Sequence, residues 1–456
     1  MTTGIEKTLH FETALTSTGW QKDVAITVDP NGWITAVVEN VSGADADEAH
    51  AIGVPGMVNL HSHAFQRAMA GLTERRDNPR DSFWTWRTWM YRFVDQLTPD
   101  DLLVIAQLTY AEMLEAGFTG VCEFHYVHHA PDGRPYDDVA AMSAAICEAA
   151  ATTGMGLTLL PVFYEQGGFD GRPPSDAQQR FANLPDTYET LFEAAEKHIT
   201  ALPDACMGIA PHSLRATSPT SLTQLLQSHP TGPVHIHIAE QTAEVDDCVA
   251  WSGARPVAWL MDHATVDGRW CLVHATHISQ DEIRAIATSG ATVGLCPITE
   301  ANLGDGIFPA STYEGTFGIG SDSNVLIGLA AELSLLEYGQ RLRDRSRSVL
   351  AQTGGSVGGN LFRKSLAGGM ATSGRKTGCL ALDYRADIVA LNASHPALAA
   401  RRGDALLDGW IFAGDNTVID TVWVGGVKQV TGGHHKIRDP LRQKFNATLT
   451  HLIQEA

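Results

Sequence analysis

Histidine and aspartate residues of a kind that binds metals recur in this sequence where short apolar runs end. His61 and His63 are separated by one residue, and in an extended strand such positions point to the same side. His237, His274 and Asp322 each lie at or just beyond the end of a later apolar run. Neutral imidazole and carboxylate groups are common ligands of zinc, so these five residues indicate metal-dependent chemistry.

Each of these residues also has an ordinary structural explanation when it is considered alone. A histidine inside an apolar strand is often a core residue with its hydrogen bonds satisfied, and we expect this of His235. An aspartate at a strand end often caps the next helix, which is the alternative for Asp322. Only the combination of these residues on related elements favours a metal site.

Eight short apolar runs alternate with longer helical stretches from about residue 53 onward, and these elements must position the candidate residues. The runs are 56–63, 119–126, 156–163, 206–213, 233–240, 270–277, 291–297 and 316–323. The segments 98–101 and 279–282 are typical helix starts. The alternation predicts a parallel (β/α)8 barrel of the TIM type, with its chemistry at the carboxyl ends of the strands. An open doubly wound sheet is the alternative.

Both ends of the chain are expected to form β structure. The first 50 residues alternate around a turn at 29–32, and β character returns after residue 375. We therefore expect a small β-sandwich domain built from both chain ends. Its two parts would be 1–52 and 376–435, flanking a catalytic barrel over 53–375 and followed by a helical tail over 436–456.

Composition restricts the partners and the compartment. The chain has 32 lysines and arginines against 52 acidic residues, a formal net charge of −20, which disfavours nucleic acid and anionic membranes as partners. No apolar run approaches the roughly 20 residues that span a bilayer, and no secretory signal is visible. Seven scattered cysteines without a CxxC pair indicate free thiols, so we expect a soluble cytoplasmic protein.

In this order, the candidate residues resemble the metal-ligand pattern of the amidohydrolase superfamily. That superfamily has a His-x-His on strand 1, histidines on strands 5 and 6 and an aspartate on strand 8. The resemblance covers nearly the whole chain, because segments 386–392 and 420–426 resemble the small β domain of the superfamily.

A scarcity of lysine distinguishes between the branches of this superfamily. Binuclear members use a carboxylated lysine at the end of strand 4, but between Lys22 and Lys364 the chain has only Lys197, in a helical stretch. The resemblance therefore implies the mononuclear deaminase branch, whose HxxE pattern is matched by Glu240. It implies one Zn²⁺ per chain, bound by His61, His63, His237 and Asp322.

The types of these residues predict a hydrolytic mechanism. Catalytic zinc lowers the pKa of bound water to about 7. Asp322 is expected to accept the proton from that water, and His274 to orient the water and polarise the electrophile. Glu240 is expected to carry a proton to the leaving nitrogen, so that ammonia departs from a C=N carbon.

Four further segments resemble a deiminase branch of the superfamily that acts on an N-formimino dicarboxylate. They are 64–72, 83–87, 123–126 and 210–215. The resemblance implies a substrate site lined by Gln66, Arg87, Tyr126, His212 and Arg215. It also implies a homodimer that converts N-formimino-L-glutamate to N-formyl-L-glutamate and ammonia in histidine degradation.

The chemistry of two arginines suits such a substrate, because planar guanidinium groups bind carboxylates in pairs of hydrogen bonds. Alternatives remain open: Arg87 lies in a tryptophan-rich stretch and could stack on an indole, and Arg215 could be a surface residue. The stretch 84–89 either covers the substrate or packs at the barrel edge.

Two competing functions also remain open at this point. One is a mononuclear zinc deaminase of an aromatic base or nucleoside, of the guanine or adenosine-derivative type, which would need stacking contacts in place of arginine forks. The other is a barrel without catalytic activity that binds or assembles with other molecules.

Overall fold

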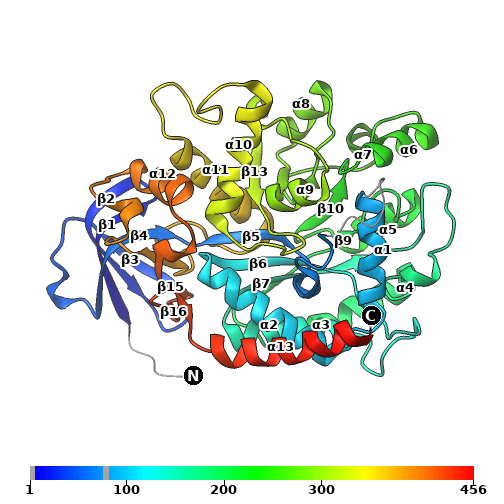
Figure 1. The fold of residues 1–456 in the computed structure, drawn as a ribbon, viewed down its shortest axis with the longest axis horizontal. Helices are drawn as coiled ribbons and strands as arrows, with labels where there is room; N and C mark the ends of the chain where they lie inside the picture. The colour runs from blue at the N-terminus through cyan, green and yellow to red at the C-terminus, as the bar shows by residue number, and fades with distance from the viewer. Residues whose placement is uncertain (1–5, 75–81, 456) are drawn as a thin grey trace.

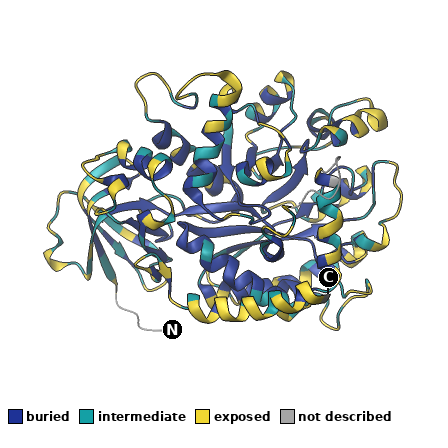
Figure 2. Cartoon of the chain, viewed as in Figure 1, coloured by how far each residue is buried: buried dark blue, intermediate teal, exposed yellow. Residues whose placement is uncertain are grey.

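Parallel strands occupy the middle of the molecule, and a second sheet lies beside them (Figure 1). The computed structural model describes residues 6–74 and 82–455. The parallel strands are deeply buried, whereas the helices around them expose their outer faces (Figure 2).

The parallel strands form two hydrogen-bonded groups. The first contains β5 (Met57–Ser62), β6 (Phe118–His125), β7 (Gly156–Phe163), β8 (Cys206–Met207) and β9 (Ala210–Pro211). The second contains β10 (Val234–Ile238), β11 (Trp270–His274), β12 (Thr292–Leu295) and β13 (Thr316–Ile319). Each of the eight predicted apolar runs therefore contains a strand. The fourth run differs from the prediction because it is divided into two short strands.

Single bridging pairs connect the two groups of strands. Ser62, at the end of β5, pairs in parallel with Asp322, just beyond β13. Ile209, between β8 and β9, pairs in parallel with Val234 at the start of β10. These pairs bring the carboxyl end of β5 beside the end of β13 and the fourth run beside β10.

Helices follow the strands along the chain and cover them. They are α1 (Phe83–Val94), α2 (Pro99–Glu115), α3 (Ala141–Thr153), α4 (Pro185–Ile199), α5 (Pro219–Ser228), α6 (Thr242–Ser252), α7 (Pro256–His263), α8 (Gln280–Ser289), α9 (Pro297–Leu303), α10 (Leu329–Asp344) and α11 (Val357–Ser373). The two predicted helix starts are confirmed: α2 and α8 each begin with a capping box, formed by Thr98 with Asp101 and by Ser279 with Glu282.

Strands from both chain ends form one mixed sheet of eight strands, at the left in Figure 1. They are β1 (Lys7–Thr16), β2 (Gly19–Val28), β3 (Ile34–Val38), β4 (Glu48–Pro55), β14 (Ile388–Leu391), β15 (Ile419–Val424), β16 (Val427–Thr431) and β17 (His434–His435). The halves join where β4 pairs antiparallel with β14. The prediction of a β unit built from both ends is confirmed, while its description as a sandwich stays a prediction.

Two more helices accompany this sheet. α12 (Asp404–Ala413) lies between β14 and β15 in the chain, and α13 (Arg438–Glu455) follows β17. α13 runs beneath the parallel strands and packs against α2, where Leu441 contacts Leu108 and Ala111 (Figure 1). No helix within the described ranges combines the length and apolar character needed to cross a membrane.

A buried arginine connects the terminal sheet to the parallel strands. The Arg375 guanidinium lies 2.8 Å from a carboxylate oxygen of Asp204, before β8, and 3.2 Å from one of Asp387, before β14. Its approach requires glycine at Gly120 and Gly156, because a Cβ atom at either position would lie 2.3 Å from the guanidinium group. Charges so deeply buried are stable only when they are paired, so this cluster fixes how the two sheets dock.

Replacing this arginine tests that role. Arg375→Met removes the guanidinium that joins Asp204 to the buried Asp387 and, among the described residues, leaves Asp204 with Arg385 alone as an ion-pair partner. We expect the free energy of unfolding to fall by about 3–5 kcal/mol. Chemical denaturation measures the change. The control is Arg284→Met, which breaks an exposed ion pair with Asp281 and should cost less than about 1 kcal/mol. Equal losses in the two variants would contradict the proposed role.

Candidate metal-dependent active site

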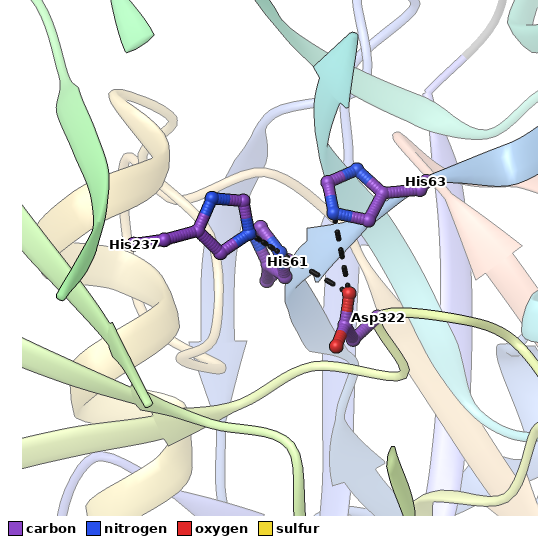
Figure 3. Close-up of side chains that lie close together, drawn as sticks. All are labelled: His61, His63, His237 and Asp322. Carbon is purple, nitrogen blue, oxygen red and sulfur yellow. Dashed lines mark hydrogen bonds and ion pairs between the residues drawn. The ribbon is translucent and has the colours of Figure 1, made fainter. Parts of the chain in front are cut away.

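Three histidine nitrogens and one carboxylate oxygen converge at the carboxyl ends of the parallel strands (Figure 3). His61 Nε2 lies 3.1 Å from His237 Nε2 and 3.4 Å from Asp322 Oδ1. His63 Nε2 lies 3.3 Å from the same Asp322 oxygen. The side chains come from the end of β5, from β10 and from the turn after β13, and all four are buried.

Backbone carbonyl groups set which nitrogen of His63 and of His237 faces the centre of this cluster. His63 Nδ1 donates to the Phe124 carbonyl at 2.8 Å, and His237 Nδ1 donates to the His212 carbonyl at 3.1 Å. Since a carbonyl only accepts, each Nδ1 carries the hydrogen and each Nε2 presents a lone pair. Burial lowers the pKa of His61 to about 3, so its imidazole is also neutral at physiological pH.

This set of donor atoms fits a divalent cation. Lone pairs on nitrogens as close as His61 Nε2 and His237 Nε2 repel one another unless a proton or a cation lies between them. Burial would raise the pKa of Asp322, but contacts with His61 and His63 hold it well below its usual range, so the carboxylate is charged. Three neutral imidazoles and one carboxylate form a set that zinc accepts, and each predicted ligand has a place in it.

The turn that carries Asp322 is tied to β5 by its backbone. The Asp322 N–H donates to the His61 carbonyl at 2.9 Å, and its carbonyl accepts from the His63 N–H at 3.0 Å. The Asn324 amide donates to the carbonyls of His63 and Asp322. Because α10 begins only at Leu329, Asp322 does not cap that helix, and the capping alternative is wrong.

Backbone strain gathers around the same cluster. Ala239, His274, Ala275 and Asp322 have φ angles of 52°, 65°, 47° and 44°, respectively. Residues other than glycine seldom adopt this left-handed conformation, and it tends to occur where a functional site demands it. The strain lies at the ends of β10, β11 and β13, where the side chains must turn toward a common point.

A histidine and a glutamate beside the ligand cluster are arranged for proton transfer. His274 Nε2 lies 3.7 Å from Glu240 Oε1 and 3.8 Å from Asp322 Oδ2, while its Nδ1 lies 3.3 Å from Glu300 Oε1. Burial would lower the pKa of His274, but these three carboxylates raise it to about 10. Burial raises the pKa of Glu240 to about 7, so this carboxyl group can gain or lose a proton near neutral pH.

A cavity opens onto these groups, and the five predicted substrate residues line it: Gln66, Arg87, Tyr126, His212 and Arg215. Glu240 and His274 line it as well. The Gln66 amide donates to the Tyr126 hydroxyl at 2.8 Å, which holds both side chains in the wall. Their roles toward a substrate stay predictions.

The two arginines that line the cavity differ in the contacts that their guanidinium groups make. Arg87, on α1, donates to the Tyr164 hydroxyl at 3.4 Å and lies over the Tyr91 ring, 5.1 Å from its centroid. Within residues 6–74 and 82–455, the Arg215 guanidinium makes no hydrogen bond or ion pair. Arg215 lines the cavity and is only partly exposed, so it differs from an ordinary surface residue.

Sequence reasoning missed several residues of the cavity wall. They are Met90, Tyr91, Tyr164, Phe181 and Leu303. Phe83 and Trp86 also line the cavity, and they belong to the segments 83–87 and 84–89 named from the sequence. Tyr164 directly follows β7, and a polar aromatic residue at a strand end is a signal that could have identified it. Met90 and Tyr91, farther along α1, carry no such signal, because only the tertiary structure places that part of the helix beside the cavity.

Comparison with known proteins defines the class of the chain. Residues 52–428 match the amidohydrolase family, and the chain belongs to that family. Formimidoylglutamate deiminase of Pseudomonas aeruginosa is 47% identical over 447 residues, which cover 97% of this chain and 98% of that protein.

Solved structures show the same fold. The crystal structure of an amidohydrolase from Brucella melitensis superposes with a TM-score of 0.95 at 48% identity, covering 98% of this chain and 100% of that one. An adenosine deaminase from Xanthomonas campestris with bound zinc superposes with a TM-score of 0.81 at 20% identity, covering 98% of both chains. The second similarity extends to the fold alone.

Two histidines of β10 provide a matched test of the ligand cluster. His237 belongs to the cluster, whereas His235, two residues earlier on the same strand, lies outside it and donates through Nε2 to the Thr372 carbonyl at 3.0 Å. We expect His237→Ala to lose most of its bound metal, because one of four ligands is removed, and His235→Ala to keep about one ion per chain. Elemental analysis after dialysis measures the metal content. Equal metal contents in the two variants would remove His237 from the ligand set.

Proposed function

We propose that this chain hydrolyses N-formimino-L-glutamate to N-formyl-L-glutamate and ammonia, with one Zn²⁺ per chain. The observation that carries this proposal is a cavity whose wall holds two unlike groups of side chains. Histidines and Asp322 of the ligand cluster form one group, and Arg87 and Arg215 form the other. The substrate has a formimino carbon at one end and two carboxylates at the other. The full-length similarity to a formimidoylglutamate deiminase supports the same substrate.

The residues that would hold the metal are His61, His63, His237 and Asp322. When bound there, zinc would polarise the electrophile and lower the pKa of water to about 7. Iron and manganese accept related donors, so elemental analysis of the native protein must identify the metal.

The chain's own residues would divide the proton transfers. Asp322 would accept a proton from the attacking water, since its carboxylate is charged in the folded protein. His274 is held by Glu300 with Nε2 toward the cavity, where it would orient the water and polarise the C=N bond. Glu240, with a pKa raised to about 7, would carry a proton to the departing nitrogen. Water adds to the carbon, the C–N bond breaks and ammonia leaves.

Arg87 and Arg215 would bind the two carboxylates of the substrate. Gln66, Tyr126 and His212 also line the cavity and would orient the substrate in it. The net charge of −20 does not favour attraction of a dianion from a distance. Recognition would therefore come from these few placed donors, which act at short range.

We further infer that the parallel strands close into a (β/α)8 barrel. The bridging pairs between β5 and the turn after β13, and between the fourth run and β10, support closure at both edges. The domain limits that we propose are 1–52 and 376–435 for a small β-sandwich domain, 53–375 for the barrel and 436–456 for a helical tail.

A homodimer in the cytoplasm, without nucleic-acid or membrane partners, completes the proposal. All seven cysteines are unpaired and five of them are buried, which supports a reducing compartment. Light scattering of the purified chain tests the oligomeric state.

Arginine substitutions test the identity of the substrate. A hydrogen bond to a charged group contributes about 1.5–3 kcal/mol, so Arg215→Met should lower kcat/KM for N-formimino-L-glutamate by about 10- to 100-fold. Ammonia release measures the rate, with formylglutamate identified as the product. Arg284→Met, on the surface, is the control and should match the wild type.

Wild-type rates in both Arg87→Met and Arg215→Met would contradict the dicarboxylate assignment. Turnover of guanine or an adenosine derivative in its place would favour the aromatic-base alternative. A wild-type chain that binds no stoichiometric metal, even after zinc is added, would favour a protein without catalytic activity.

The proton-transfer role of Glu240 gives a separate prediction. Glu240→Gln keeps the size of the side chain but cannot carry a proton, so we expect kcat to fall by about 10²- to 10⁴-fold. Metal content should stay that of the wild type, because Glu240 is outside the four-ligand cluster. Steady-state rates and elemental analysis of the same sample check both points, and a kcat within a few-fold of wild type would exclude this role.

A further inference from the structure

Two tyrosines of the cavity wall, Tyr91 and Tyr164, contact Arg87, and their hydroxyls share one amide donor. Tyr164, just after β7, accepts a hydrogen bond from Gln178 Nε2 at 2.6 Å and from Arg87 at 3.4 Å. Tyr91, on α1, accepts from the same Gln178 Nε2 at 3.4 Å. Both tyrosines line the cavity, while Gln178 is buried behind them.

The direction of these hydrogen bonds is set by the other end of the Gln178 amide. Gln178 ends the short 3₁₀ helix Asp176–Gln178, and its Oε1 accepts from the backbone N–H of Ser175 at 2.8 Å and from the Ser175 hydroxyl at 3.0 Å. An N–H can only donate, so the amide oxygen must face Ser175. The NH₂ group is therefore the part that faces the two phenols, and both phenol oxygens must accept.

The hydroxyl hydrogen of Tyr164 has no acceptor among the residues that the structure describes. A phenol has one hydrogen to donate, and both hydrogen bonds of the Tyr164 oxygen are ones that it accepts. The side chain is 1% exposed, and a buried donor without an acceptor is unfavourable, so the site calls for an acceptor on the ligand.

The position of Tyr164 indicates which part of a ligand supplies that acceptor. Its ring packs edge to face against His212 at 4.8 Å, and its hydroxyl contacts the guanidinium of Arg87. Arg87, Arg215 and a hydroxyl directed in this way offer hydrogens and no lone pairs. Such a set matches a carboxylate, which only accepts, and it opposes a carboxamide, whose NH₂ group would meet another donor.

We propose that Tyr164 is a substrate-binding residue whose hydroxyl donates to a carboxylate of the substrate, and that Gln178 is the positioning residue that sets this direction. This inference rests on the proposed function. It deepens that function by assigning to Tyr164 and Gln178 the selection of a carboxylate over a carboxamide in the substrate. Arg87 and Tyr164 contact one carboxylate together, so the loss of either weakens binding of that group.

Tyr164→Phe removes only the hydroxyl and is the direct test. We expect KM for N-formimino-L-glutamate to rise about 10- to 100-fold with kcat little changed, because the lost bond is made equally in the ground and transition states. The same variant is then measured with N-formimino-L-glutamine and N-formimino-L-isoglutamine, each of which lacks one carboxylate. The rise in KM caused by Tyr164→Phe should disappear with the analogue that lacks the carboxylate bound by Tyr164. It should persist with the other analogue. An equal penalty on all three substrates would show a merely structural role and overturn the proposal.

Two further variants separate positioning from general disturbance of the fold. Gln178→Met keeps the charge and approximate size of the side chain but no longer donates to the two phenol oxygens, so their hydroxyl groups can rotate. We therefore expect a smaller rise in KM than in Tyr164→Phe, with the same differences among the three substrates. Tyr313→Phe is the matched control, because its buried hydroxyl donates to the Thr316 carbonyl at 3.0 Å, away from the cavity. It should leave KM unchanged for all three substrates. A Gln178→Met variant with wild-type kinetics would remove the positioning role.

A binding measurement distinguishes failure of this inference from failure of the proposed function. Titration calorimetry with glutarate compares the zinc-loaded wild type with Tyr164→Phe, and we expect binding to the variant to be about 10-fold weaker or more. If the wild type releases no ammonia but glutarate binding still weakens, the proposed function fails and the carboxylate contact stands. Equal affinity of both proteins for glutarate would overturn the contact, whatever the outcome of the activity assay.

Discussion

The site depends on keeping three imidazole nitrogens and one carboxylate oxygen within about 5 Å of each other inside the protein. Bringing these groups together is unfavourable, because the lone pairs of neutral nitrogens repel one another and a buried carboxylate loses its hydration. Hydrogen bonds from the rest of the chain hold the groups in place against this cost. Carbonyl groups hold His63 and His237 in one orientation, and backbone hydrogen bonds tie the Asp322 turn to β5. The positive φ angles at these strand ends are part of the same requirement.

The polar groups in the cavity wall are of two kinds, hydrogen-bond acceptors and hydrogen-bond donors. The side chains of the ligand cluster present lone pairs and carboxylates to the cavity, whereas Arg87 and Arg215 present hydrogens. A molecule that satisfies both groups must have an electrophilic part and an anionic part. Because the protein as a whole is strongly acidic, this contrast arises from the placement of a few side chains and not from overall charge.

Local patterns predicted those features that depend on neighbouring residues. The eight apolar runs became strands, and the capping boxes began α2 and α8, because strand alternation and helix capping are short-range effects. The fourth run was predicted less well, since its apolar pattern does not show that the strand divides between β8 and β9. The alternative role of Asp322 as a helix cap was excluded only by the observed start of α10 at Leu329.

By itself, the sequence determined the types and order of the candidate metal ligands, the eight apolar runs among which they lie and the absence of a lysine at the end of the fourth run. The tertiary structure decided which atoms face one another. It placed α1 beside the cavity and left the Arg215 charge without an ion pair among residues 6–74 and 82–455. It also directed the Tyr164 hydroxyl through an amide whose orientation Ser175 sets. The physical reason is that hydrogen-bond direction and the proximity of distant segments depend on packing across the whole chain, which no local pattern encodes.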